Sequence, residues 1–382
     1  MNRIEVQKFI KKFKILDIII KHPGLSKTQI KIKADLSMES TLSYLDMLEK
    51  EGLVVSKLEN RKGRPGRKSE AYFPVANSSY YIGIKFLAHR INGVILNLNS
   101  DIVYEVEKQY DHRKISQEEL LNRIYEIISC LLKEIDKNKL MAIGISCPGL
   151  IDSKNGILNH YTSVIDKNIP LKKLVEEKED VPVYIDSSTK TNALYYKLKN
   201  ANSNSNLIYV YIGAGVTSSL VIDGKVYRCN NNNDGEIGHL KIANHNGKCS
   251  CGRNGCLETI IGNNYIISDL NSKGVNVCTI QGFVDELNKK NEVAISIMND
   301  IVSSLGSVLL NIVTFTAVEE LVISGAYTHA RQFKDGITKY IHDNCLSEIT
   351  NKLTIKFILD DNKANAIEAA TLAFYQSQSD FN

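Results

Sequence analysis

The sequence predicts an α/β protein in which a small basic module of helices precedes a larger body of two α/β lobes. At 382 residues the chain is too long for one ordinary hydrophobic core, so two or three domains are expected. Apolar residues recur at helical spacing near the N-terminus, whereas short apolar runs alternate with helical patterns later in the chain. Two lobes that enclose a cleft are the architecture we expect for the body.

Charge is distributed unevenly, although the net charge of the whole sequence is only +4. Residues 1–78 hold 16 Lys and Arg against 9 Asp and Glu, which gives this segment a charge of +7. The remaining residues hold 31 basic and 34 acidic side chains, which gives −3. A basic module on a mildly acidic body favours a polyanionic partner for the N-terminus.

Composition is typical of a globular protein in a reducing compartment. The hydrophobic share is 43%, no apolar run looks long enough to span a bilayer, and the N-terminus lacks the apolar stretch of a signal peptide. Eight cysteines without a secretion signal favour metal binding over disulfides. We therefore expect a cytoplasmic protein without membrane partners.

Residues 1–78, which we call the N-terminal module, have the pattern of three helices. A first amphipathic helix should end at His22-Pro23-Gly24, and Ser26 is placed to cap a second helix over residues 27–33. After a turn that contains Asp35, Ser37 is placed to cap a third helix up to about Lys50. The residues of this third helix expected to face inward are Leu42, Leu45 and Leu48.

Two short strands, near residues 53–55 and 71–75, flank the basic stretch RKGRPGRK at residues 61–68. Helix, helix, turn, helix and a basic two-stranded wing make a winged helix-turn-helix, whose third helix would enter a DNA major groove N-terminus first. The alternatives are a dimerisation module and a solvated basic linker. The candidate DNA contacts are Ser26, Lys27, Thr28, Glu39, Ser40, Thr41, Ser43, Tyr44, Arg64, Arg67 and Lys68.

A cluster of metal-ligand residues lies in the stretch EIGHLKIANHNGKCSCGRNGCLE, residues 236–258, which we call the metal loop. Three thiols and one imidazole suit a closed, structural zinc site, and Gly252 and Gly255 let the backbone turn between them. The acids Glu236 and Glu258 bracket the cluster and could accept hydrogen bonds from ligand hydroxyls. The alternative is a set of scattered free cysteines beside surface acids. The expected zinc ligands are His239, Cys249, Cys251 and Cys256.

The pattern E-x-x-H, nine residues, then C-x-C-G-x-x-G-C-x-E resembles the zinc motif of the ROK family of repressors and sugar kinases. LSKTQI and LSMESTLSYLDMLEKEGLV resemble the N-terminal domain of ROK repressors, and weaker similarity extends over most of residues 80–382. The resemblance implies that Glu236, His239 and Glu258 contact a sugar; the alternative is that Glu236 and Glu258 only support the zinc site. The resemblance divides the chain into a DNA-binding domain, residues 1–78, and a ROK domain, residues 79–382, with lobes of approximately 79–190 and 191–382.

Each lobe is expected to begin with paired strands. The order strand, strand, strand, helix, strand over residues 80–147 resembles the ribonuclease-H-like lobe of sugar kinases and actin, and a second copy begins near Leu207. In active kinases of this superfamily, the first hairpin carries an Asp and a small turn that hold magnesium and phosphate. Here Lys85 takes the place of that Asp, and Leu87-Ala88-His89 replaces the small turn. The second phosphate loop retains only Gly213 and Gly215, which is a weak signal.

The catalytic base of the family kinases is also missing. Where the family has an Asn-Asp pair, this chain has Ser187-Ser188, and an unactivated serine hydroxyl is not a base at neutral pH. Asp186 is a possible substitute, and Ser163 replaces a further sugar-contacting Asn. These losses predict that the protein is not an enzyme. The residues expected around an effector are Glu236, His239, Glu258, Ser187 and Ser188.

Together these features predict a zinc-containing transcriptional regulator, a repressor of carbohydrate-related genes. Its partners would be operator DNA, a sugar or sugar-phosphate effector, and further copies of itself in a homodimer or homotetramer, since two-fold operators mirror two-fold proteins. Two alternatives stay open. One is an active sugar kinase that carries a DNA-binding head, and the other is a ligand-free regulator whose body serves only dimerisation or protein contacts.

Overall fold

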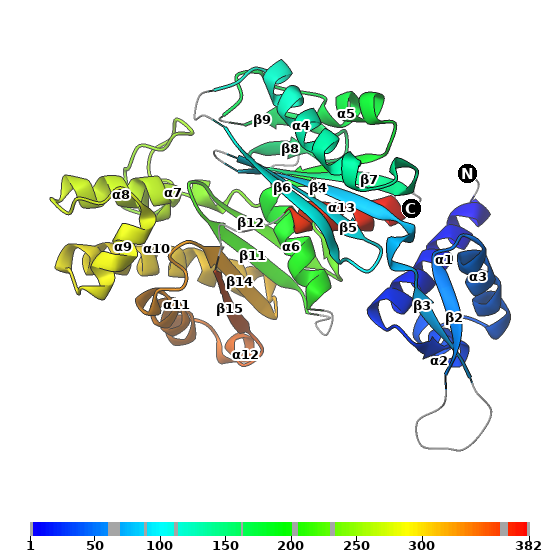
Figure 1. Cartoon of the computed structure of the whole chain (residues 1–382). Helices are drawn as coiled ribbons and strands as arrows, with labels where there is room; N and C mark the ends of the chain where they lie inside the picture. The colour runs from blue at the N-terminus through cyan, green and yellow to red at the C-terminus, as the bar shows by residue number, and fades with distance from the viewer. Residues whose placement is uncertain are drawn as a thin grey trace. The chain divides into compact units, whose positions relative to one another are not determined.

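The chain folds into two units, one of which is built from both ends of the sequence (Figure 1). Unit 1 comprises Met1–Ser187 and Asn365–Asn382, and unit 2 comprises Ser188–Ala364. The computed structural model describes residues 3–59, 69–87, 90–110, 114–161, 163–200, 205–229, 234–359 and 366–379. Within these ranges the predicted order of helices and strands can be compared with the structure.

The N-terminal module contains three helices and one small antiparallel sheet in the order β1-β3-β2. Its hydrophobic core is formed where Ile15, Leu16 and Ile19 meet Ile30 and Leu45, all at most 1% exposed. The short strand β1 was not expected. The elements are α1 (Arg3–Lys21), β1 (Leu25–Ser26), α2 (Lys27–Ala34), α3 (Met38–Lys50), β2 (Val54–Glu59) and β3 (Ser69–Pro74).

Local hydrogen bonds place the ends of α2 and α3 where the sequence predicts them. The backbone N–H of Ser26 donates to Oε1 of Gln29 at 2.9 Å, and the hydroxyl of Ser37 accepts from the N–H of Ser40 at 3.1 Å. Asp35 ends α2 in the left-handed conformation with φ 55°, which an Asp tolerates better than most residues. The turn between the two helices is therefore determined by residues within it.

The remainder of unit 1 is built on a five-stranded sheet in the order β10-β7-β4-β5-β6. Strands β4, β5 and β6 are antiparallel neighbours, whereas β7 and β10 run parallel to β4. Helix α4 packs against β5 and β6 over a core of isoleucine and leucine side chains. The bounds are β4 (Tyr80–Leu87), β5 (Arg90–Asn97), β6 (Ile102–Gln109), α4 (Gln117–Leu131), β7 (Leu140–Cys147), β8 (Leu150–Asp152), β9 (Ile157–His160), α5 (Leu171–Glu179) and β10 (Val183–Ser187).

The C-terminal helix α13 (Ile367–Ser379) packs on β4 and β7. Residues 365–382 belong to unit 1, whereas the lobe boundaries expected from the sequence put them in the second lobe. Close packing is possible because Gly83 and Gly144 leave room that a Cβ would fill: it would overlap the carbonyl oxygens of Ala366 and Ala369. Small residues on both surfaces thus let backbone approach backbone, at a pair of positions far apart in the sequence.

Unit 2 repeats this strand order, with a second five-stranded sheet in the order β13-β12-β11-β14-β15. Here too the first three strands are antiparallel and the last two run parallel to the first. The bounds are α6 (Ser188–Lys199), β11 (Leu207–Ile212), β12 (Val216–Ile222), β13 (Lys225–Val226), α7 (Glu258–Ile261), α8 (Asn263–Ser272), α9 (Ile280–Asn288), α10 (Glu292–Thr316), β14 (Glu320–Gly325), α11 (Arg331–Asn344), α12 (Ser347–Thr350) and β15 (Thr354–Leu359).

Helix α10 contradicts the expectation that no apolar run of the sequence is long enough to span a bilayer. Its 25 residues are long and apolar enough, by length and composition, to cross a membrane, so the statement that no run is long enough was wrong. Ile301, Leu305 and Leu309 on this helix are fully buried in the hydrophobic core of unit 2, and α11 packs along it. The packing of these residues accounts for part of the apolar composition, while other apolar residues of the helix, such as Phe315 at 91%, are exposed.

Candidate metal centre and adjoining polar cluster

The four expected metal ligands come together in unit 2. One ligand atom from each of His239, Cys249, Cys251 and Cys256 lies within 4.8 Å of all the others. The sulfur atoms of Cys251 and Cys256 are 3.7 Å apart, and Sγ of Cys249 is 3.7 Å from Nδ1 of His239. A tetrahedron with zinc–sulfur bonds of 2.3 Å has edges of about 3.8 Å. The donor set and its spacing therefore fit zinc.

Two glycines shape the metal loop as its sequence predicts. Gly252 and Gly255 have φ of +87° and +78°, a region that side chains disfavour. The N–H of Cys249 donates to the carbonyl of Arg253 at 2.9 Å, and the N–H of Gly255 donates to that of Gly247 at 2.8 Å. The backbone thus folds over itself between the second and fourth ligands, which brings three thiols to one point.

The environment of the thiols separates their acidities. The backbone N–H of Arg253, together with its guanidinium, lowers the pKa of the Cys251 thiol to about 6. Burial, together with the neighbouring thiols, raises the pKa of Cys256 to about 12. Zinc binds thiolates, so a bound cation would stabilise the deprotonated form that burial of Cys256 disfavours.

His239 presents its two ring nitrogens to different groups. Nδ1 faces Cys249 and the other metal ligands, whereas Nε2 lies 4.0 Å from Oε2 of Glu236. A carboxylate beside the second nitrogen of a metal-bound histidine orients the ring. Burial raises the pKa of Glu236, and although His239 opposes this effect, Glu258 adds to it. Glu236, whose side chain is 33% exposed, remains accessible to a ligand.

Glu258 is held more firmly than Glu236. The residue is 7% exposed, its Oε2 accepts from the N–H of Val216 at 3.1 Å, and its Oε1 lies 3.8 Å from Sγ of Cys249. This carboxylate therefore connects the metal loop to the start of β12. Its described contacts are those of a group that supports the metal loop, while Glu236 is the more accessible of the two acids.

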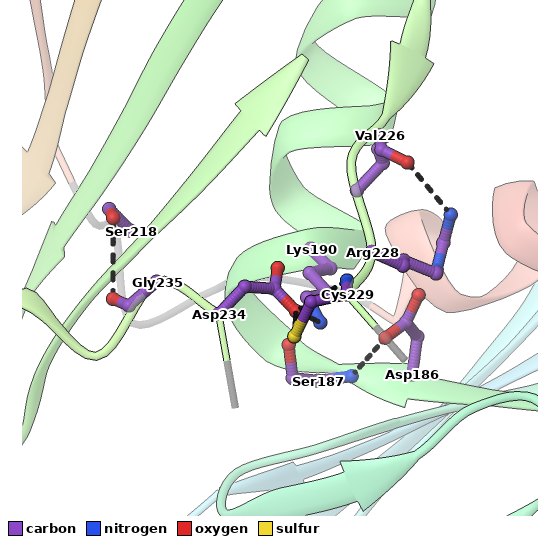
Figure 2. Close-up of polar contacts among 9 residues, drawn as sticks. All are labelled: Asp186, Ser187, Lys190, Ser218, Val226, Arg228, Cys229, Asp234 and Gly235. Carbon is purple, nitrogen blue, oxygen red and sulfur yellow. Dashed lines mark hydrogen bonds and ion pairs between the residues drawn. The ribbon is translucent and has the colours of Figure 1, made fainter. Parts of the chain in front are cut away.

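Lys190, Cys229 and Asp234 form a polar cluster that was not expected from the sequence (Figure 2). The ammonium of Lys190 lies 3.0 Å from Oδ1 of Asp234, and their side chains are only 5% and 13% exposed. Both the N–H and the thiol of Cys229 donate to the same Oδ1 at 3.2 Å. Burial acts to raise the pKa of Asp234, but the bonds from Lys190 and Cys229 outweigh it, so the net shift is downward. Of the three residues, Asp234 could have been considered from the sequence, because it lies two residues before Glu236.

Lys85, at the position where the resemblance implies the Asp of family kinases, is buried in unit 1. Its Nζ lies 2.5 Å from Oε1 of Glu368 on α13, and the two side chains are 7% and 6% exposed. This position therefore holds one partner of an internal ion pair. Leu87 ends β4, and Ala88 and His89 lie outside the described residues.

The other altered positions lie at the ends of secondary structure. Ser187 ends β10 and Ser188 begins α6, as expected for a strand-to-helix turn. Asp186, the possible substitute base, is 1% exposed, and its Oδ1 accepts from the N–H of Ser187 at 2.9 Å (Figure 2). Burial argues against its use as an accessible base. Gly213 and Gly215 form a tight turn between β11 and β12, closed by a 2.9 Å bond from the N–H of Gly213 to the carbonyl of Gly215.

The structure revises the outward face of α3. Thr41 and Tyr44, expected to point outward, are 0% and 8% exposed, and the hydroxyl of Thr41 donates to the carbonyl of Ser37 at 2.9 Å. Leu42, expected to face inward, is 42% exposed. Packing against α1 and α2 determines the rotation of α3 about its own axis. Helical spacing alone predicted this rotation only to within about one residue position.

The remaining DNA-contact predictions fall into two groups. Lys27, Thr28, Glu39 and Ser43 are exposed, and Ser26 and Ser40 are half-buried, so all six stay available. The basic stretch between β2 and β3 lies outside the described residues, and with it the expected contacts Arg64, Arg67 and Lys68.

Comparisons with known proteins extend over nearly the whole chain. A family model described as the ROK family matches residues 81–375. The putative xylose repressor of Caldicellulosiruptor sp. (strain Rt8B.4) is 28% identical over 333 residues, 83% of each chain. The DNA-binding transcriptional dual regulator NagC of Escherichia coli (strain K12) is 23% identical over 344 residues, 86% of this chain and 84% of NagC.

Solved structures show the same fold. A ROK family transcriptional regulator, described as a homolog of the E. coli MLC protein, superposes with a TM-score of 0.86 at 19% identity and covers 98% of both chains. A ROK hexokinase from Thermus thermophilus superposes with a TM-score of 0.66 at 17% identity and covers 78% of this chain and 99% of its own. The regulator therefore shares the fold of the N-terminal module as well as that of the body.

Proposed function

We propose that this chain, which belongs to the ROK family, is a DNA-binding transcriptional repressor whose body senses a sugar-like effector. The observation that carries the proposal is the match to xylose and N-acetylglucosamine repressors over most of both chains. The 86% coverage by NagC exceeds the roughly 80% of the chain that residues 79–382 make up, so it includes part of the N-terminal module. The basic charge of residues 1–78 supports DNA as its partner.

In this proposal α3 enters the major groove and the N-terminus of α2 approaches the phosphates. Lys27 and Thr28 begin α2, where free backbone N–H groups favour an anion. Arg64 and Arg67 between β2 and β3 would reach the minor groove. The binding unit is proposed to be a dimer or tetramer, which light scattering of the purified protein measures directly.

DNA binding is tested with sites selected from a random duplex pool by the full-length protein. Lys27→Gln should weaken binding to a selected site and reduce the slope of log K against log[salt] by about 1, because one phosphate contact is lost. Lys339→Gln is a matched control, since Lys339 is an exposed lysine of the body. Failure to select any duplex above the non-specific level at moderate salt would refute the proposal.

For the body, we propose that zinc holds the metal loop rigid while Glu236 and His239 present polar groups to the effector. Zinc, when bound, would supply a fixed tetrahedral support through His239, Cys249, Cys251 and Cys256. Nε2 of His239 and the carboxylate of Glu236 lie on the side of the ring away from the thiols, where they can bond sugar hydroxyls. Glu258 would support this arrangement through Val216. Ser187 and Ser188 remain proposed effector contacts.

An effector works only if it binds the DNA-incompetent arrangement more tightly than the competent one. The proposal therefore predicts that at least one member of a panel of sugars and sugar phosphates releases the protein from its operator. Glu236→Gln should abolish this release while DNA affinity without sugar stays within twofold. Glu177→Gln, an exposed acid elsewhere, is the control. If no sugar gives either release or calorimetric heat, the body serves only dimerisation or protein contacts.

We further propose that the body does not phosphorylate sugars. Lys85, which is paired with Glu368, stands where the family resemblance implies a magnesium-binding carboxylate, and Ser188 stands where it implies the base. A coupled ATP-turnover assay with the same sugar panel tests this point. Sustained turnover that depends on sugar would instead support a kinase with a DNA-binding head.

A further inference from the structure

The outward face of α3 carries an unusual set of side chains for a helix expected in a DNA groove. Glu39, Leu42, Ser43 and Asp46 are exposed, with 42% of Leu42 accessible. The opposite face is fully occupied by the module's core, whose α3 members are Thr41, Tyr44, Leu45 and Leu48. The rotation of α3 is therefore settled, and a partner that meets this helix near its N-terminus must meet an acid, a leucine and a serine.

The two acids indicate what α3 can and cannot approach. Asp46 is paired with Lys50 at 2.7 Å, whereas the described residues give no ion pair to Glu39. A carboxylate is repelled by phosphate, but in the major groove it can accept a hydrogen bond from the N4 amine of cytosine. Phosphate contacts then fall to the exposed lysines of α2, Lys27 and Lys33. The N-terminal half of α3 is suited to base edges and unsuited to the DNA backbone.

Leu42 lies three residues after Glu39, which corresponds to a rise of about 4.5 Å along the helix. Successive base pairs are separated by about 3.4 Å, so a helix lying along the groove would bring Leu42 to a base pair next to that of Glu39. The apolar group that bases present in the major groove is the C5-methyl of thymine. A leucine there gains by covering a methyl group and has no polar atom to satisfy.

We propose that Leu42 is a specificity-determining residue that selects thymine through its C5-methyl group, on a base pair adjoining a cytosine read by Glu39. This inference rests on the proposed function, because it assumes that α3 enters the major groove. A second copy of the chain is a poorer partner for the same face. In a two-fold contact around Leu42, the acids Glu39 and Asp46 of one copy would approach those of the other.

The test uses the full-length protein and a site selected from random duplexes. Each thymine is replaced in turn by deoxyuridine, which removes only the C5-methyl, and Kd is measured by fluorescence anisotropy. At one position in each half-site, loss of the methyl should weaken wild-type binding about fourfold, as expected for one buried methyl-sized group. Leu42→Ala should bind the thymine and deoxyuridine duplexes equally, whereas Leu42→Met should keep part of the preference.

Leu346→Ala is the matched control, because Leu346 is an exposed leucine of the body at 63% accessibility. It should keep the full thymine preference. The inference alone is overturned if wild type binds its site tightly but tolerates every deoxyuridine within 1.5-fold, or if Leu42→Ala retains the preference. A change in oligomeric state of Leu42→Ala with an unchanged preference would assign the leucine to a protein contact. Failure to select any duplex overturns the proposed function together with this inference.

Discussion

The buried Lys85–Glu368 ion pair allows a specific prediction about the stability of unit 1. Both side chains are less than 8% exposed, and the charged atoms are 2.5 Å apart. Glu368→Gln leaves a buried ammonium without its counter-charge, which typically costs 3–5 kcal/mol. In a unit of about 200 residues this corresponds to a decrease in Tm of roughly 10 °C. The double variant Lys85→Met with Glu368→Leu removes both charges and should be close to wild type or more stable.

Chemical and thermal unfolding, followed by circular dichroism, measure these differences. Because the chain has two compact units, a separate probe of unit 1 is needed, such as hydrogen exchange of the β4 amides. The coupling energy between the two substitutions should then amount to several kcal/mol. Stability of Glu368→Gln within about 0.5 kcal/mol of wild type would contradict the interpretation, since it would place Lys85 in contact with water.

Three further outcomes are expected. Cys256→Ser should lose the bound metal in elemental analysis and should show faster hydrogen exchange over residues 236–258. The control Cys278→Ser, at an exposed cysteine, should change neither result, and full metal content in Cys256→Ser would contradict the proposed ligand set. Gly144→Val should destabilise unit 1 by at least 1–3 kcal/mol in denaturant unfolding, because its side chain overlaps the backbone of α13, and an unchanged midpoint would show that α13 does not pack there. The pKa of Asp234 is lowered on folding, so the stability that its carboxylate contributes is present above the unfolded-state pKa and is lost as pH falls through the folded-state pKa. Asp234→Asn should lower the free energy of unfolding near pH 7 by leaving Lys190 unpaired, and the difference from wild type should shrink below about pH 4. A difference that does not change with pH would refute this linkage.

The metal loop is conspicuous in the sequence, but the sequence does not distinguish the two acids that flank its ligands. All four expected ligands converge, and both glycines, expected to let the backbone turn, have positive φ. The two acids that flank them look equivalent in the sequence, but the structure separates them. Glu258 is engaged by Val216 and lies beside Cys249, while Glu236 keeps a third of its side chain exposed. Their different burial could be learned only from the packing of β12 against the loop.

Short-range features of this protein were determined by the sequence itself. Ser26, Gln29, Ser37 and Asp35 act on backbone groups within a few residues, and the metal ligands lie within 18 residues of one another, so spacing is nearly sufficient to define their geometry. Repetition of the strand pattern likewise indicated two sheets of the same order. For the helix caps and the metal loop the interacting groups are neighbours along the chain, and loop closure leaves few alternatives.

The tertiary structure decided what depends on partners distant in sequence. Helix α13 returns to β4 and β7 because Gly83 and Gly144 admit it, and this brings Glu368 to Lys85. Burial of Thr41 and exposure of Leu42 follow from the rotation that α1 and α2 impose on α3. A helical pattern identifies the buried face of a helix, but it does not decide whether residues at the border of that face are buried or exposed. No local pattern identifies the strand against which a distant helix will pack.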